Sequence, residues 1–129
     1  MAKFAHSDTL DGGPLSIKSD VQKMFLISAY SFGDSYATVM ANKLNAGVSM
    51  TSGDFTQSSS GNNRLITVAS GKSDVATAAA SGTPDLHIAF TNGSSKVLWV
   101  TDETTNQPIG IGNTINFPSG LTYTVTQPT

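Results

Sequence analysis

The chain has 129 residues, a formal net charge of −2 and no Cys. This length predicts a single domain with its own core, and the lack of Cys excludes disulfides, thiolate metal sites and a thiol nucleophile. Arg64 is the only Arg and the Lys residues are scattered, so we expect no nucleic-acid partner. The longest apolar run, at 24–27, is too short to cross a bilayer, so we expect no membrane partner either.

Residues 1–20 are predicted to form an extended N-terminal arm. The stretch 11–14, Asp-Gly-Gly-Pro, is a cluster of turn and breaker residues. Phe4 and Leu10 are isolated among polar residues, which is typical of a segment that orders against a neighbouring subunit or frays. No apolar signal sequence follows the first Met, and we therefore expect synthesis in the cytoplasm.

The first predicted strand spans 21–30, where apolar residues fall on both faces of an extended run. Residues 31–34 end it. Asp34 or Ser35 can then cap a short helix near 35–43, although the same residues also fit a strand.

Between residues 48 and 82 the strand signals are weaker. We expect a short strand at 48–50, a polar loop at 58–63 and a strand at 64–69, where apolar residues occur at alternate positions. The small residues at 72–82 fit either a flat edge strand or a surface loop.

A β-hairpin over 85–103 is the strongest local prediction. Two runs rich in β-branched and aromatic residues flank Asn92-Gly93, and a tight turn needs the positive φ that Asn and Gly adopt at low cost. The second run, 96–101, is apolar on both faces and carries Trp99, so it is predicted to be a central strand covered above and below. The acidic pair Asp102-Glu103 is interpreted as solubilising the end of the hairpin.

The C-terminal part contains short extended pieces at 109–117, broken by glycines, and a half-buried strand at 121–125. Short strands separated by turns predict an all-β fold, a compact β-sandwich or β-barrel over 21–129. The expected core anchors are Phe25, Ile27, Ile88, Phe90, Val97, Trp99 and Tyr123.

One short stretch has the residues of a catalytic motif. Residues 32–36, Phe-Gly-Asp-Ser-Tyr, are similar to the nucleophile block of the GDSL (SGNH) esterases, in which a Ser acts with an Asp-x-x-His near the C-terminus. The nearest match, Asp85-Leu86-His87, is one residue too short and lies mid-chain, and the family's layered fold needs several long helices. A small esterase is therefore a distant alternative, and we expect no enzyme and no catalytic residue.

Metal and cofactor motifs are also missing from the sequence. The two His residues, His6 and His87, are far apart and have no paired ligand spacing. We therefore expect no metal site and no cofactor.

Several stretches resemble a family of small virion proteins of tailed bacteriophages. The matching segments are Met-Ala-Lys-Phe at 1–4, Asp-x-Leu-Asp-Gly at 8–12, 33–39, Gly-Asp-Phe-Thr at 53–56, 87–93, 97–103, and 116–118 with the Gln-Pro ending at 127–128. The resemblance implies a capsid decoration, or cement, protein whose gene neighbours that of the major capsid protein. It implies the major capsid protein as partner, a homo-oligomer with a trimer favoured, and location on the capsid surface of the virion after synthesis in the host cytoplasm. The family supplies no catalytic residues.

The composition is compatible with this resemblance. Charged residues make up 12% of the chain, about half the usual share, and Ser, Thr, Asn and Gly replace them, as is common in virion, fibre and secreted β-proteins. The arm is expected to contact the capsid or a neighbouring subunit, and its contact residues are predicted to be Lys3, Phe4, His6 and Leu10. The alternative is a phage tail or head-fibre module that binds receptor glycans.

Overall fold

The computed structural model describes residues 5–128, apart from the side chains of residues 7–9. Within this range the strands form antiparallel sheets of four, three and two strands, which confirms the prediction of a mostly β, sandwich-like fold. The four-stranded sheet has the strand order β2 (Val48–Ser49), β1 (Lys23–Ile27), β6 (His87–Thr91), β7 (Val97–Asp102).

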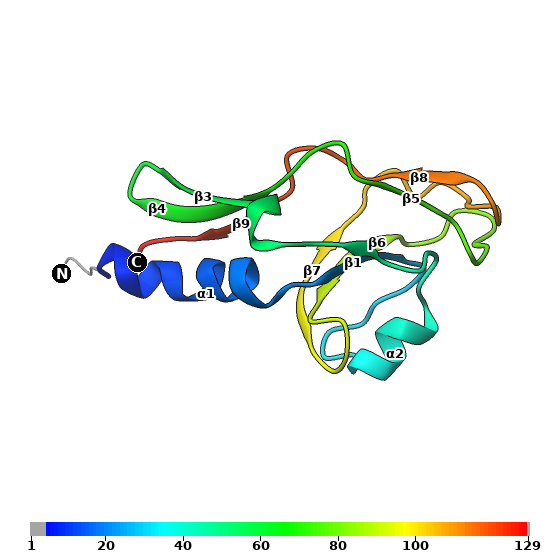
Figure 1. The fold of residues 1–129 in the computed structure, drawn as a ribbon, viewed down its shortest axis with the longest axis horizontal. Helices are drawn as coiled ribbons and strands as arrows, with labels where there is room; N and C mark the ends of the chain where they lie inside the picture. Colours follow the sequence, from blue (N-terminus) through cyan, green and yellow to red (C-terminus); the bar gives the residue numbers. More distant parts are fainter. Residues whose placement is uncertain (1–4, 129) are drawn as a thin grey trace.

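The other elements surround this sheet (Figure 1). The three-stranded sheet contains β3 (Phe55–Ser60), β4 (Asn63–Val68) and β9 (Thr122–Val125), and the two-stranded sheet pairs β5 (Ser73–Val75) with β8 (Thr114–Asn116). The helices are α1 (Ser7–Asp20), α2 (Tyr36–Ala41) and the 3₁₀ turn η1 (Ser52–Asp54). Figure 1 shows α1 running along the three-stranded sheet, with the paired strands β5 and β8 at the opposite end of the molecule from α1.

Residues on both faces of β1 are buried, which explains its uninterrupted apolar sequence. Met24 and Leu26 face the main core, between the four-stranded sheet and the rest of the β structure. Phe25 and Ile27 face a smaller cluster that includes Val39 of α2. A strand covered on both faces needs apolar side chains at successive positions, and β1 and its neighbour β6 are the two inner strands of the sheet.

The predicted hairpin is formed by β6 and β7. Its turn is held by the Asn92 side chain, whose Oδ1 accepts hydrogen bonds from the backbone N–H groups of Ser94, Ser95 and Lys96. Gly93 has a φ of 81°, the left-handed conformation that the Asn-Gly pair predicted. The position of β7 was predicted wrongly, because β7 lies at the edge of the sheet and its residues are half-buried, apart from the exposed Asp102.

Residues 7–20 form a helix and not the predicted extended arm. Leu10, Pro14 and Ile17 are spaced along one face of α1, and all three are buried, with α1 packed on β4 and β9. Most of the stability of a short helix comes from packing of such a face, so the weak intrinsic propensity of Gly-Gly-Pro does not prevent the helix from forming. The predicted domain boundary at residue 20 therefore falls at the end of a helix that packs on the body.

Smaller predictions have mixed outcomes. The short helix near 35–43 is confirmed as α2, and Ser35 is its N-cap. The loop predicted at 58–63 is wrong in extent, because Ser58–Ser60 belong to β3 and only Gly61 and Asn62 form the turn to β4. The stretch 72–82 contains the short strand β5 and otherwise isolated bridges and turns.

Candidate functional site

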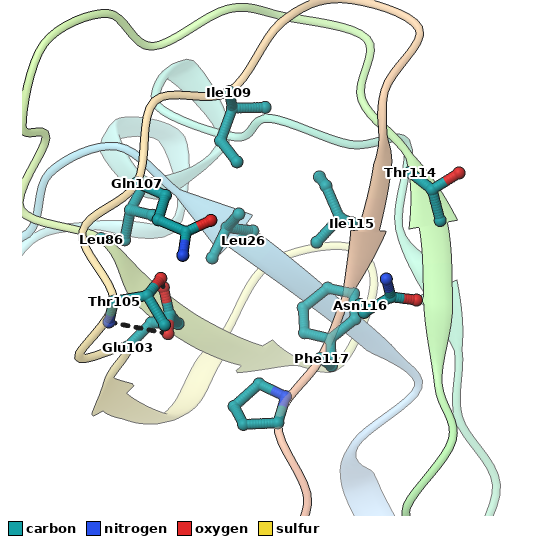
Figure 2. A pocket seen from close by; sticks show the side chains of 11 residues that line it. Leu26, Leu86, Glu103, Thr105, Gln107, Ile109, Thr114, Ile115, Asn116 and Phe117 are labelled. Atoms are coloured by element: carbon teal, nitrogen blue, oxygen red, sulfur yellow. Dashed lines mark hydrogen bonds between the residues drawn. The ribbon is translucent and has the colours of Figure 1, made fainter.

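A pocket of about 440 Å³ lies between the four-stranded sheet and the β8 region. Leu26 of β1 lies at its centre, and Ile115 and Phe117 form one wall (Figure 2). Glu103 and Thr105 lie on the opposite wall. The remaining lining residues are Leu86, Gln107, Ile109, Thr114, Asn116 and Pro118. In Figure 2 the side chains of Thr114 and Asn116 point away from Leu26, as expected for residues that alternate with Ile115 along a strand.

The segment after β7 builds the polar wall. Its start is attached to the segment before β6, because the Glu103 N–H donates to the Leu86 carbonyl at 3.0 Å. The Leu86 N–H lies 3.1 Å from Oδ1 of Asn106, a residue whose φ is 49°. Asn is one of the few residues that adopt this left-handed conformation readily. Ile109 then pairs with Ala80 through two backbone hydrogen bonds, and the whole segment is held in place.

Of the lining residues that the structure describes, Glu103 alone is ionisable, and just 8% of the residue is exposed. Its Oε1 accepts a hydrogen bond from the Thr105 N–H at 3.0 Å, and its Oε2 accepts one from the Thr105 hydroxyl at 2.6 Å. A carboxylate has about four lone-pair positions, so each oxygen retains one for a further donor. The pocket therefore offers apolar walls with one oriented negative charge.

The lining is mostly apolar and carries a few polar groups. Leu26, Leu86, Ile115 and Phe117 supply apolar surface, and the polar groups besides Glu103 are hydroxyls and amides. Among the described residues that line the pocket there is no His, Lys or Ser that could act with Glu103 as a second acid, base or nucleophile. The arrangement resembles the general pattern of ligand sites, mostly apolar with a few placed polar groups.

A second cluster lies at the open end of the β6–β7 hairpin. His87 pairs across the strands with Asp102, and ligand atoms of Asp85, His87 and Asp102 all lie within 4.8 Å of one another. His87 Nδ1 is 3.1 Å from the Asp85 carbonyl oxygen, which can only accept a hydrogen bond, so Nδ1 carries the proton in this contact. An imidazole and two carboxylates are suitable ligands for a divalent metal, but both Asp residues are exposed and well solvated.

The catalytic-looking stretch 32–36 has a structural role. The Ser35 Oγ accepts a hydrogen bond from the Thr38 N–H at 3.2 Å and lies 3.1 Å from the Thr38 hydroxyl, so it caps α2. Asp34 accepts from the Ser31 N–H and closes the preceding turn. His87, the residue that the esterase motif would use as its base, lies beside the ring of Tyr30, and the two ring centroids are 5.9 Å apart.

The four residues predicted to contact the capsid or a neighbouring subunit have different positions. Lys3 and Phe4 lie outside the described residues. His6 is exposed. Leu10 is only 5% exposed, because α1 packs it against the body of the same chain, so it is not available at the surface as predicted.

The predicted core anchors lie in or beside the two hydrophobic clusters. Phe25, Ile27, Ile88 and Phe90 are buried. Val97, Trp99 and Tyr123 are partly buried and pack against these clusters. Trp99 stacks on Phe90 with ring centroids 4.6 Å apart and meets Tyr123 edge to face at 5.7 Å, so it is not an open platform for a sugar ring.

Ion pairs attach α1 to β4 and η1 to the residue before β5. The Arg64 Nε donates to Asp11 Oδ1 at 2.7 Å, and Lys72 Nζ lies 2.7 Å from Asp54 Oδ1. The bonded Arg64 guanidinium lowers the pKa of Asp11 below its ordinary value of 3.8. Burial acts to raise the pKa of Asp54, but hydrogen bonds from Lys72 and Thr51 outweigh it, and the pKa is lowered.

Sequence reasoning missed the pocket and its carboxylate. The acidic pair Asp102-Glu103 was read as solvated, which is correct for the exposed Asp102 and wrong for the buried Glu103. The only available signal was alternation, because successive residues of an extended chain face opposite sides.

No protein-family model, no curated protein and no solved structure matches the chain. No helix among residues 5–128 is long and apolar enough to span a membrane.

Proposed function

We propose that this chain is a structural virion protein of a tailed bacteriophage, which binds the outer surface of the capsid and stabilises the shell. The proposal rests on the resemblance of segments spread from residue 1 to residue 128, together with a surface poor in charge. A cement protein needs a stable body without metals or disulfides, and the two hydrophobic clusters provide it. Its partners are the major capsid protein and other copies of the chain, with a trimer favoured.

The structural observation that supports this function most is Phe32. Its exposed fraction is 103%, so its ring makes no packing contact that hides it from water. Aromatic residues are enriched among the side chains that carry the binding energy of protein interfaces. Phe32 sits in a polar turn before α2, where it has no role in the core. We therefore assign Phe32 as an anchor for the capsid, repeated on every copy so that weak contacts add up.

Phe32 takes over part of the capsid-binding role that the sequence predicted for the N-terminal arm. Removal of residues 1–15 would take away Leu10 and Pro14, whose side chains are buried in the body. The truncated protein would lose stability whether or not the segment binds a capsid, so truncation is a poor test. A point substitution at an exposed residue separates binding from folding.

The test uses shells of a phage that encodes this chain, prepared without it. We expect the purified protein to sediment with the shells and to add density on their outer surface in electron micrographs. Phe32→Ala should lower the affinity about tenfold or more while the free energy of unfolding changes by less than about 0.5 kcal/mol. Val75→Ala, which also removes an exposed apolar side chain, is the matched control and should bind normally.

Three results would contradict the proposal. Wild-type protein that does not sediment with the shells has no decoration role. Hydrolysis of a short-chain ester that disappears in Ser35→Ala would support the esterase, and selective binding to bacterial surface glycans would support a receptor-binding module.

A further inference from the structure

Glu103 has an unusual electrostatic position. The residue is only 8% exposed, and both hydrogen bonds to its carboxylate come from the uncharged Thr105. Among residues 5–128 the ion pairs of the structure involve Asp11 and Asp54, and none reaches Glu103. Burial of a carboxylate is costly unless a positive charge compensates it, and residues 5–128 supply none in an ion pair with Glu103.

The pocket has space for the missing cation beside this carboxylate. It encloses about 440 Å³, and Leu26, Leu86 and Phe117 supply apolar surface facing Glu103. A long aliphatic stem could pack on these side chains while a charged head reaches the two free lone-pair positions of the carboxylate. An isolated metal ion or ammonium ion would leave the apolar surface uncovered.

We propose that this pocket receives an arginine side chain from the partner protein, which under the proposed function is the major capsid protein. A guanidinium is planar, so it can bind both carboxylate oxygens and also lie against the Phe117 ring. It is more weakly hydrated than an ammonium group, and its transfer into a largely apolar pocket therefore costs less. This inference rests on the proposed function for the identity of the partner, but the ligand chemistry comes from the pocket alone.

A second copy of this chain is a poor source of the arginine. Arg64 is the only Arg in the sequence. Its guanidinium already donates to both carboxylate oxygens of Asp11, at 2.7 and 3.4 Å. Insertion into the pocket of another copy would break this ion pair between α1 and β4, so the arginine belongs to a different protein.

The first experiment measures the chemical preference of the pocket on the full isotope-labelled chain. The probe is N-acetyl-arginine amide, and N-acetyl-citrulline amide is its uncharged analogue of nearly the same shape. We expect the arginine probe to shift the NMR signals of Leu86, Glu103, Thr105, Ile115 and Phe117, and the citrulline probe to bind about tenfold more weakly or worse.

Two variants assign this preference to the carboxylate. Glu103→Gln keeps the size and an acceptor for Thr105 but removes the charge, and it should weaken arginine binding about tenfold. Asp20→Asn makes the same change of charge at an exposed site at the end of α1, and it should have no effect. The titration of the wild-type chain can overturn the proposal by itself. It does so if the arginine and citrulline probes bind equally, or if the arginine probe shifts NMR signals elsewhere in the chain.

The shell-binding assay separates this inference from the proposed function. Loss of shell affinity in Glu103→Gln, with normal affinity in Asp20→Asn, is the expected result. Normal shell affinity in Glu103→Gln would overturn the insertion of a capsid arginine into this pocket and leave the decoration function standing. Failure of the wild-type chain to bind shells would instead overturn the decoration function and the capsid protein as the source of the arginine, while the titration alone decides the chemistry of the pocket.

Discussion

The side-chain amide of Asn45 donates a hydrogen bond to Oδ2 of Asp74 at 2.9 Å, and this bond ties the segment between α2 and β2 to β5 of the two-stranded sheet. Asn45 has no exposed surface. Its Oδ1 accepts a hydrogen bond from the Leu26 N–H of β1 at 2.8 Å. One buried side chain therefore satisfies the backbone of one sheet and holds the start of β5, next to the strands that frame the pocket.

We expect Asn45→Ala to lower the free energy of unfolding by about 2–4 kcal/mol, because it leaves the Leu26 N–H without its acceptor and removes the side-chain donor of the Asp74 carboxylate, which keeps only the backbone donors Gly47 and Val75. Urea denaturation followed by the fluorescence of Trp99, the only Trp, measures this value. Asn42→Ala removes a single exposed hydrogen bond to the Thr38 carbonyl, so it should cost less than about 1 kcal/mol. Similar losses in the two variants would argue against a linking role for Asn45.

Acid should destabilise the protein through its paired carboxyl groups. The pKa values of Asp11 and Asp54 are lowered in the folded state, so folding is favoured more strongly when these groups are ionised. Their stabilising contribution is complete above about pH 5 and is lost as the pH falls through 3.8 and then through the lower folded-state values. The urea concentration at the midpoint of unfolding should therefore decrease as the pH is lowered from about 5 to about 3.

Substitution of Asp11 identifies its share of this pH dependence. Asp11→Asn removes the ion pair with Arg64, so it should lower stability at pH 7 and flatten the fall towards pH 3. Asp20→Asn, at an exposed site on the same helix, should keep the wild-type slope. An unchanged slope in Asp11→Asn would show that other groups govern acid unfolding.

Two glycines should respond in opposite ways to replacement by alanine. Gly12 lies within α1, and a Cβ there would meet no atom within 4 Å, so Gly12→Ala should stabilise the protein by about 0.5–1 kcal/mol. Gly47 has a φ of 118°, and its Cβ would lie 2.8 Å from Cε1 of the buried Phe25. Gly47→Ala should therefore destabilise it by about 2 kcal/mol or more.

Thermal unfolding of both glycine variants and the wild type shows directly whether each substitution raises or lowers the stability. A stable Gly47→Ala protein would mean that the loop between α2 and β2 shifts to relieve the contact. A destabilised Gly12→Ala protein would mean that residues 7–20 are not helical in solution.

The sequence by itself determined the elements whose signal lies within a few neighbouring residues. Asn92 and Gly93 specified the hairpin, because a tight turn needs a left-handed residue and a side chain that binds the turn backbone. Ser35 specified the start of α2 through its cap. The apolar residues on both faces of β1 specified a doubly covered strand, because burial on either side is written into successive positions.

Only the tertiary structure decided the features that depend on distant segments. Residues 7–20 are helical because β4 and β9 cover the face that carries Leu10 and Ile17, and the local sequence does not predict this packing. The pocket brings Leu26, Glu103 and Phe117 together from three parts of the chain. Whether a carboxylate at the end of a strand is exposed to water or lies in an apolar pocket depends on which segments pack against it. These segments are distant in the sequence, so the residues next to the carboxylate do not predict its environment.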